Sequence, residues 1–360
     1  MNTFGKKLKL TIFGESHGSS IGGVIDGLPS GIKLDLELIK KEMSRRAPGK
    51  NKISTQRSES DDFIIESGFF EGYTTGTPLC VRIKNSDTHS KDYSILKNMM
   101  RPSHSDYPAF IKYGGFNDYR GGGSFSGRLT APIVFAGSIA KQILKEKYNI
   151  NVVAHIYSIK DIKDREFNLN GESEEILSKL SEKKLPVLDD EKISCMEEEI
   201  LKAKSKGDSV GGVIECMVIN IGAGLGFSFF DSVESVISHG IFSIPSVKGI
   251  EFGKGFDITK LFGSVANDEY YFDENKNIKT KTNNNGGILG GITNGMPIIF
   301  RVAIKPTPSI SLPQNTINIS TKENEILEIK GRHDPCIVQR AVAVIESMTA
   351  FIILDLLLSI

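Results

Sequence analysis

The chain has 360 residues, and its 44 Lys and Arg residues balance 44 Asp and Glu residues, so the formal net charge at pH 7 is zero. A balanced charge gives no reason to expect a nucleic acid or an anionic membrane as a partner. The length is sufficient for a large hydrophobic core, and 36 glycines indicate many turns and loops. We therefore expect a globular protein that binds neither nucleic acid nor membrane.

The cysteines, the N-terminus and the apolar run near the C-terminus argue against several further kinds of protein and site. Four cysteines lie far apart, with no C-x-x-C pair and no histidine at metal-ligand spacing, so we expect neither disulfides nor a metal site. The N-terminus shows no apolar signal region, which favours a cytoplasmic location. Polar and charged residues interrupt the apolar run at 341–358, and we expect a buried helix there.

The first half of the chain has the pattern of strands alternating with helices. Residues 8–13 and 21–25 are strand-like, and Asp35 is expected to cap the helix that follows it. Residues 63–85 alternate in strand fashion around turn residues, and an apolar helix is expected after Thr130 as its N-cap. A mixture of α and β structure follows from this order.

The middle of the chain is different in composition. Residues 160–192 are highly charged and poor in aromatic residues, which predicts an excursion on the surface. Ser194 and Glu197 form a capping box, which predicts a helix that ends near Lys206.

Several features of the first half recur in the same order in the second half. The matching segments are 21–26 with 210–215, and 72–82 with 291–301. Asp35 at a helix start recurs as Asp231, where Glu234 would complete a capping box.

We interpret these matches as an internal duplication. The predicted fold class is α+β, with two β–α–β halves at about residues 10–148 and 207–358 packed about a pseudo-twofold axis around one core. Residues 1–360 would then form a single domain. Chance similarity among glycine-rich strands is the alternative.

A glycine-rich loop before the apolar helix is the strongest candidate for a ligand site. Residues 121–123 are glycines, and Ser124 and Ser126 follow them. Consecutive glycines let the backbone approach a ligand, the serines add hydroxyl donors, and the N-terminus of a helix favours an anion. With Arg120 and Arg128 at its ends, the loop is interpreted as a cradle for a phosphorylated ligand, although a flexible connector is an alternative.

Arginine is scarce and lies beside Gly, His and Pro, whereas lysine is scattered. The arginines placed in this way are Arg45, Arg46, Arg101, Arg120, Arg128 and Arg332. The guanidinium group offers a rigid fork for phosphate and carboxylate, so this placement predicts a small ligand with several negative charges.

Three side chains are candidates for proton transfer. His17 follows a strand, His104 follows an arginine, and Asp334 follows Arg332-His333. A histidine beside phosphate-binding arginines can act as a general acid on a leaving phosphate. The alternatives are hydrogen-bonded structural histidines and, for Asp334, a helix N-cap before Pro335.

Two other functional classes remain open at this level. One is a protein that binds a phosphorylated metabolite without chemistry, although the histidines and Asp334 argue against it. The other is phosphoryl transfer, although the sequence has no Walker A motif and no evident carboxylate pair for magnesium.

Three segments resemble the signatures of chorismate synthase. They are Gly-Glu-Ser-His-Gly at 14–18, Gly-Ser-Phe-Ser-Gly-Arg at 123–128 and Gly-Arg-His-Asp-Pro-Cys at 331–336. Supporting matches extend the resemblance over essentially the whole chain. That family converts 5-enolpyruvylshikimate 3-phosphate to chorismate and phosphate by a trans-1,4-elimination, the last common step of the shikimate pathway, and uses reduced FMN without net redox change. The resemblance thus implies a carbon–oxygen lyase.

The resemblance also implies roles for individual residues. His17 would protonate the departing phosphate, His104 would protonate the reduced flavin ring, and Asp334 would relay the proton at flavin N5. The implied substrate-binding residues are Ser16, Arg46, Arg128 and Arg332. The implied FMN-binding residues are Ser124, Phe125, Ser126, Pro245, Ser246, Gly290, Lys305, Pro306, Thr307, Pro308, Ser309 and Arg332. Arg46 and Lys52 match positions assigned to NADPH.

Finally, the resemblance implies partners and an assembly. Members that reduce their own flavin are longer than this chain, so we expect a monofunctional enzyme with an external flavin reductase and NADPH as an indirect reductant. A homotetramer is expected. Ala47 and Lys52 depart from the family pattern, in which arginine is common at both positions, and lysine lacks the bidentate fork.

Overall fold

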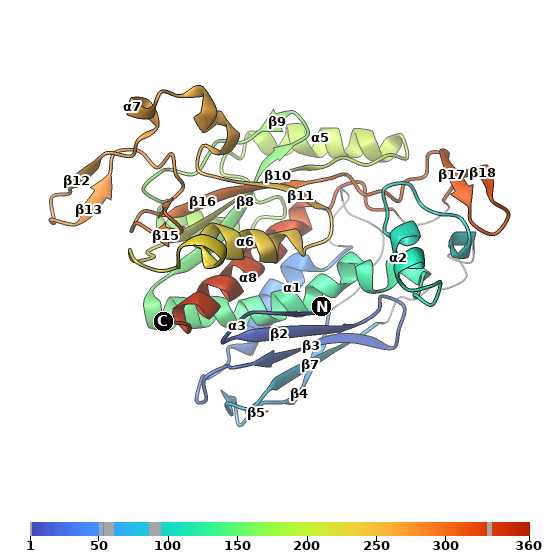
Figure 1. Ribbon diagram of the computed structural model, residues 1–360, viewed down its shortest axis with the longest axis horizontal. Helices are drawn as coiled ribbons and strands as arrows, with labels where there is room; N and C mark the ends of the chain where they lie inside the picture. The colour runs from blue at the N-terminus through green and yellow to red at the C-terminus, as the bar shows by residue number, and fades with distance from the viewer. Residues whose placement is uncertain (1, 50–52, 54–60, 86–94, 330–332) are drawn as a thin grey trace.

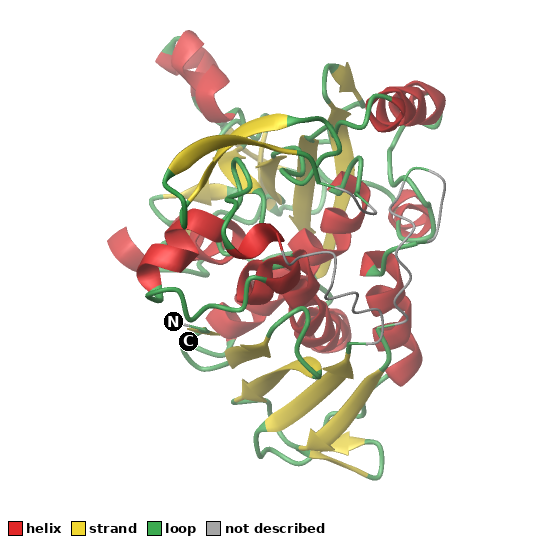
Figure 2. Cartoon of the chain, turned by 90° about the vertical axis from the view of Figure 1, so that its right-hand side faces the viewer, coloured by secondary structure: helices red, strands yellow, loops and turns green. Residues whose placement is uncertain are grey.

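The computed structural model describes residues 2–49, 53, 61–85, 95–329 and 333–360. Two five-stranded antiparallel sheets enclose a layer of helices, which Figure 1 shows from one side and Figure 2 after a quarter turn. The predicted α+β class, with a β–α–β sandwich around one core, is confirmed.

The two sheets have the same strand order. The first sheet runs β1-β2-β3-β7-β4, with β1 at Thr3–Phe4, β2 at Lys9–Gly14, β3 at Ser20–Asp26, β4 at Phe63–Ser67 and β7 at Leu79–Lys84. The second runs β11-β16-β10-β8-β9, with β8 at Asn151–Ile159, β9 at Ile162–Lys163, β10 at Gly212–Ile219, β11 at Val247–Phe252 and β16 at Ile298–Ile304. The order β2-β3-β7-β4 thus corresponds to β8-β10-β16-β11, as an internal duplication predicts. The boundaries of the two halves stay predictions.

The threonines of the repeated pattern make the same contacts in both halves. Oγ1 of Thr74 donates to the Pro29 carbonyl at 2.7 Å and accepts from the Ile32 N–H at 3.0 Å. Oγ1 of Thr293 donates to the Gly222 carbonyl at 2.6 Å and accepts from the Leu225 N–H at 3.0 Å. Each threonine is the last residue of a short hairpin and ties that hairpin to the loop after the neighbouring strand. The hairpins are β5 (Phe69–Phe70) with β6 (Tyr73–Thr74), and β14 (Ile288–Leu289) with β15 (Ile292–Thr293).

Helices α3 and α8 lie side by side in the central layer. The layer consists of α1 (Leu36–Arg46), α3 (Ala131–Tyr148), α6 (Val233–Phe242) and α8 (Val338–Leu357). Helix α8 is apolar on nearly all sides because it is buried on nearly all sides, as expected for the run at 341–358. Gly137 of α3 faces Ser347 of α8 so closely that a Cβ atom on the glycine would lie 2.4 Å from the serine Cα. Among the described helices, none is long and apolar enough to cross a membrane.

Two predicted helix starts are wrong. Asp35 does cap α1, because its side chain accepts from the N–H groups of residues 37 and 38. In the second half, however, Ser232 caps α6 by accepting from the N–H of residue 235 at 3.1 Å. Asp231 therefore lies outside the helix, and Glu234 completes no capping box, since the serine is one residue closer to the helix. Helix α5 (Lys192–Ser205) begins before Ser194, which lies within its first turn.

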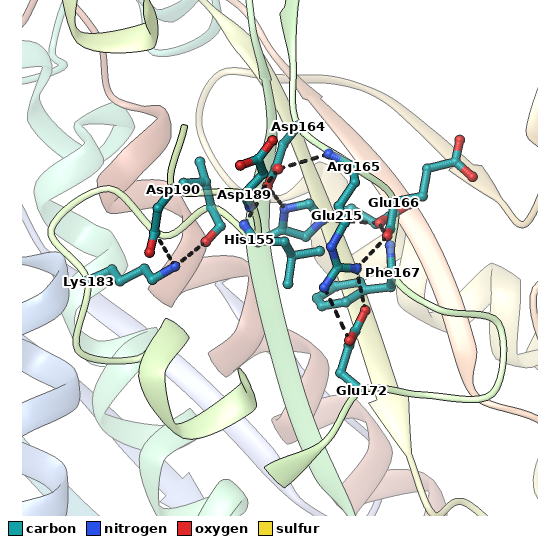
Figure 3. A network of polar contacts seen from close by, with 12 residues as sticks. His155, Asp164, Arg165, Glu166, Phe167, Glu172, Lys183, Asp189, Asp190 and Glu215 are labelled. Carbon is teal, nitrogen blue, oxygen red and sulfur yellow. Dashed lines mark hydrogen bonds and ion pairs between the residues drawn. The ribbon is translucent and has the colours of Figure 1, made fainter. Parts of the chain in front are cut away.

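A buried network ties the segment 160–192 to the second sheet, and Figure 3 shows it from close by. His155 of β8 is fully buried, with Nδ1 3.0 Å from Asp164 and Nε2 3.1 Å from Glu215 of β10. Burial alone would lower the pKa of His155, but hydrogen bonds to the two carboxylates raise it above its ordinary value. Asp164 also accepts from the N–H of Asp189 at 2.9 Å. The charged segment, which includes α4 (Glu174–Leu180), is therefore anchored to the core at these points.

Candidate active site

A cavity of about 720 Å³ opens where α8 begins. Segments that are far apart in the sequence supply its lining. They lie within residues 101–105, 121–130, 242–248, 305–309 and 333–344, together with His17, Arg46 and Ile329. Both halves of the fold therefore contribute to one hollow.

Most of the predicted site residues meet in this cavity. Its lining includes His17, His104, Asp334, Arg46, Ser124, Phe125, Ser126, Pro245, Ser246, Lys305, Thr307, Pro308 and Ser309. Ser16, Arg128 and Pro306 adjoin lining residues in the chain without lining the cavity themselves, and Gly290 lies in the β14–β15 turn, outside the lining. Arg332 and Lys52 lie outside the described residues. The assignments of ligands to individual residues stay predictions.

The glycine triplet at residues 121–123 leaves room for the rings of His17 and His104. Residues 121–123 all have positive φ, at 56°, 88° and 54°, which favours glycine. A Cβ atom on Gly121 would lie 2.3 Å from Nδ1 of His17, and one on Gly122 would lie 3.2 Å from Nε2 of His104. The sequence interpretation assigned these glycines to an anion, whereas the structure shows that two of them make room for imidazole rings. The residues that follow, 124–127, line the cavity.

The ring of His17 is oriented by Ser16. Nδ1 of His17 lies 3.0 Å from Oγ of Ser16, which in turn donates to the Gly121 carbonyl at 3.1 Å. When the single hydroxyl proton is used on this carbonyl or on that of Arg120, Ser16 accepts from Nδ1–H. In that tautomer, a proton that passes between His17 and a ligand travels through Nε2.

His104 belongs to a buried cluster with Asp106 and Arg101. Nδ1 of His104 lies 2.6 Å from Asp106, and the Arg101 guanidinium donates to the same carboxylate at 2.7 and 2.8 Å. Burial would raise the pKa of Asp106, but hydrogen bonds from Arg101 and His104 outweigh it and hold that pKa well below its usual range. Burial lowers the pKa of His104, although the hydrogen bond to Asp106 opposes the shift. The carboxylate thus fixes a proton on Nδ1, and Nε2 faces Gly122.

Asp334 does not cap a helix, because α8 begins only at Val338, after the cap residue Ile337. Its Oδ2 pairs with the guanidinium of Arg340, which also donates from Nε to the Arg46 carbonyl at 3.0 Å. Its Oδ1 is buried and, within the described part of the chain, has no hydrogen-bond partner. Burial raises the pKa of Asp334, and the pair with Arg340 opposes the shift. Such a carboxyl group can accept and release a proton.

Asp61 holds Arg46 and Arg128 next to each other. Its buried carboxylate accepts from Nε of Arg46 at 2.8 Å and forms an ion pair with the guanidinium of Arg128. Arg128 also donates to Oδ1 of Asn85 at 3.1 Å and to the Lys84 carbonyl at 3.1 Å. Arg46 lines the cavity, whereas Arg128 lies outside the described lining and is linked to Arg46 through Asp61.

Known proteins resemble this chain over nearly its whole length. The family model described as chorismate synthase matches residues 8–358. The chain is 49% identical to the chorismate synthase of Pyrococcus abyssi, over 98% of this chain and 97% of that protein. It is 46% identical to the chorismate synthase of Methanococcus aeolicus, over 99% of this chain and 97% of that protein. A crystal structure of chorismate synthase matches with a TM-score of 0.76 and 30% identity, covering 99% of this chain and 93% of that chain. The chain belongs to the chorismate synthase family.

The charges of the cavity suit the ligands of the chorismate synthase family. The described lining residues include one carboxylate, Asp334, and five lysines or arginines, which are Arg46, Arg101, Lys248, Lys305 and Arg340. Burial and the neighbouring Lys248 lower the pKa of Lys305, as expected where positive charges crowd. A ligand with phosphate and carboxylate groups would relieve this repulsion.

The residues present also fit FMN, the cofactor that the chorismate synthase family uses in its reduced form. The volume is that of a cofactor site, with apolar side chains such as Phe125 and Val344 beside a few polar groups. Serine hydroxyls and Lys305 are available for a phosphate, and the unpartnered Oδ1 of Asp334 is available for a ring N–H.

Three residues of the site were not identified as functional from the sequence. Asp61 and Asp106 lie in polar stretches that give no signal. Arg340 had one available signal, because a cation in the first turn of a helix opposes the helix dipole and needs another reason to be there. That reason is its contact with Asp334.

Proposed function

We propose that this cavity is where the chain carries out the reaction of its family, the elimination of phosphate from 5-enolpyruvylshikimate 3-phosphate to give chorismate. One observation carries the proposal: His17, His104 and Asp334 line one cavity whose other described charged lining residues are all cationic. A product with a new diene and a free phosphate needs groups that donate and accept protons within reach of an anionic substrate.

His17 serves as the acid for the leaving phosphate. It gives the proton from Nε2, while Nδ1–H stays on Ser16 and keeps the ring in place. Arg46, which Asp61 holds at the cavity wall, binds an anionic group of the substrate. Reduced FMN, when bound, supplies electron density as the bond to phosphate breaks and recovers it as the hydrogen on C6 leaves.

His104 and Asp334, which line the same cavity, would exchange protons with the flavin when it is bound. A lowered pKa means that an imidazolium at His104 gives up its proton readily, and an anionic ligand nearby would raise that pKa toward neutrality. Asp334 takes a proton at Oδ1, where its raised pKa suits both uptake and release. Closure of loop segments over the bound ligands would exclude water and strengthen these electrostatic contacts.

The test is an anaerobic assay with photoreduced FMN and 5-enolpyruvylshikimate 3-phosphate that follows both chorismate absorbance and phosphate release. We expect product with reduced FMN and none with oxidised FMN. His17→Ala, His104→Ala and Asp334→Ala should each lower kcat by about a hundredfold or more while the fold is kept. Full activity in all three variants would contradict the assigned roles.

We further propose that the chain is monofunctional and depends on an external flavin reductase, with NADPH as an indirect reductant. Arg46 is engaged with Asp61 in the cavity wall and is used for substrate. Oxidation of NADPH by the purified protein with added FMN would overturn this proposal.

A homotetramer is supported by large aromatic side chains that a single chain leaves exposed. They are Phe229, Phe230, Phe256, Phe262 and Phe272, which are 72% to 91% exposed. They lie in or next to η4 (Phe229–Asp231), η5 (Gly255–Lys260), α7 (Gly263–Ala266) and β12 (Tyr270–Phe272). Figure 1 shows α7 and β12 on an arm that projects from the sandwich. Such surface marks an association site in soluble proteins. Sedimentation at several concentrations should give four chains, and a monomer throughout would contradict the proposal.

A cytoplasmic location is supported by the four cysteines, which are all free. Fractionation of the source cells tests it, and recovery outside the cytoplasm would contradict it.

A further inference from the structure

A second cavity of about 380 Å³ lies beside the first. It opens between the end of α1, the segment 181–186 and the first turn of α8. Basic residues dominate the described part of its lining, in which Lys41, Arg45, Lys183, Lys184 and Arg340 stand against one carboxylate, Glu182. Arg340 lines both cavities, so the two hollows meet at the residue that pairs with Asp334.

Most of these cations already have partners within the chain. Arg45 pairs with two buried glutamates, Lys183 pairs with Asp190 at 2.5 Å, and Lys41 lies 3.6 Å from Glu182. Lys184 is exposed and, among the described residues, makes no ion pair. It is therefore the cation that is available to a ligand in this cavity.

The start of α8 adds a second attraction for an anion. This helix of 20 residues begins without a side-chain hydrogen bond from its cap residue Ile337, and Gln339 and Arg340 of its first turn line the cavity, near the positive end of the helix dipole. Gln339, in that first turn, lines the cavity and is 7% exposed. Its Nε2 makes one long hydrogen bond of 3.5 Å to the Ile53 carbonyl, and its Oε1 is buried with no partner in the described part of the chain.

These groups place two demands on a ligand. Lys184 and the helix terminus need anionic oxygens, whereas Oε1 of Gln339 only accepts and needs a donor. Sulfate and ionised carboxylates carry no proton to give. Inorganic phosphate offers both anionic oxygens and a donor, since even its dianion keeps one O–H group. The dianion of a phosphate monoester has no such group.

We propose that the smaller cavity is a binding site for inorganic phosphate. That this phosphate is a reaction product rests on the proposed function, in which phosphate is released into the adjoining cavity. The shared Arg340 then lies between the place of release and the second site.

Calorimetric titration of the protein at about pH 8, without substrate or FMN, tests the proposal. Inorganic phosphate, sulfate and methyl phosphate are the probes, because each is mainly a dianion at this pH and only inorganic phosphate keeps an O–H donor. We expect a phosphate site that sulfate and methyl phosphate fill more weakly. Lys184→Ala should weaken phosphate binding roughly fivefold, as loss of one charge-assisted contact implies. Gln339→Met, which keeps the side-chain volume, should abolish the preference for phosphate over sulfate.

Lys206→Ala, at an exposed lysine outside both cavities, is the matched control and should change nothing. Equal binding of the three probes, or phosphate isotherms unchanged in Lys184→Ala and Gln339→Met, would overturn the proposal. Because binding is measured without turnover, a chain that binds phosphate at this site but forms no chorismate would refute the proposed function alone. A chain that turns over normally but lacks the site would refute only this inference.

Discussion

A Cβ atom on Gly121 would lie 2.3 Å from Nδ1 of His17. The backbone at Gly121 also has φ of 56°, which an alanine tolerates poorly. We predict that Gly121→Ala displaces the imidazole and lowers kcat by about a hundredfold, comparable to loss of an acid catalyst, while the fold remains.

Gly222→Ala is the control, because a Cβ there meets nothing within 4 Å and its φ is not positive. Steady-state kinetics would measure kcat for Gly121→Ala and Gly222→Ala, and circular dichroism would check that both variants keep the fold. Normal kcat in Gly121→Ala would show that His17 does not depend on this contact.

Asp106→Asn should change the pH dependence of catalysis. The hydrogen bond to Asp106 supports the protonated form of His104 against burial, so its loss should lower the pKa of His104 further. We expect kcat at pH 7 to fall about tenfold, with the optimum moved to lower pH and a smaller change in KM. A pH–rate profile tests this, with the exposed Asp257→Asn as control.

The same variant should be less stable, because it leaves the buried guanidinium of Arg101 without its carboxylate, at a cost of about 3–5 kcal/mol. The pKa of Asp106 is held low in the folded protein, so its contribution is present above the ordinary value of about 3.9 and is lost as the pH falls below it. Melting curves at neutral pH measure the loss. An unchanged Tm would show that the ion pair between Asp106 and Arg101 does not stabilise the fold.

His155→Gln should remove a pH-dependent part of stability. The folded protein has a raised pKa at His155, so the contribution is fully present below the unfolded value of about 6.5 and is lost as the pH rises through the folded value. We expect a loss of about 3–5 kcal/mol at pH 6 and a smaller loss at pH 9. Melting of wild type and variant across this range is the measurement, with His239→Gln as control. A difference that does not change with pH would contradict the prediction.

Gly137→Ala should separate the two central helices. A Cβ on Gly137 would lie 2.3 Å from the Cβ of Ser347 and 2.4 Å from its Cα, so α3 and α8 would have to move apart. Overpacking of this kind costs about 1–3 kcal/mol. Denaturant unfolding compares it with Gly222→Ala, and equal midpoints for the two variants would refute the close crossing.

Much of the fold could be predicted from the sequence because its signals are local. The alternation of residues 21–25 and the cap at Asp35 each depend on neighbours along the chain, and both were predicted correctly. The repeat predicts the cap of α6 at Asp231, with Glu234 completing a capping box, and only the backbone path shows that Ser232 is used.

The sequence by itself determined the α+β class, the repeated pattern and the identities of His17, His104 and Asp334, because these rest on periodicity and on motifs that are continuous in the chain. Only the tertiary structure decided what surrounds them. The pairing of Asp61 with Arg128 spans 67 positions. The contact of Gly121 with His17 spans more than a hundred, and such contacts follow from how distant segments of the first half pack together rather than from any local pattern.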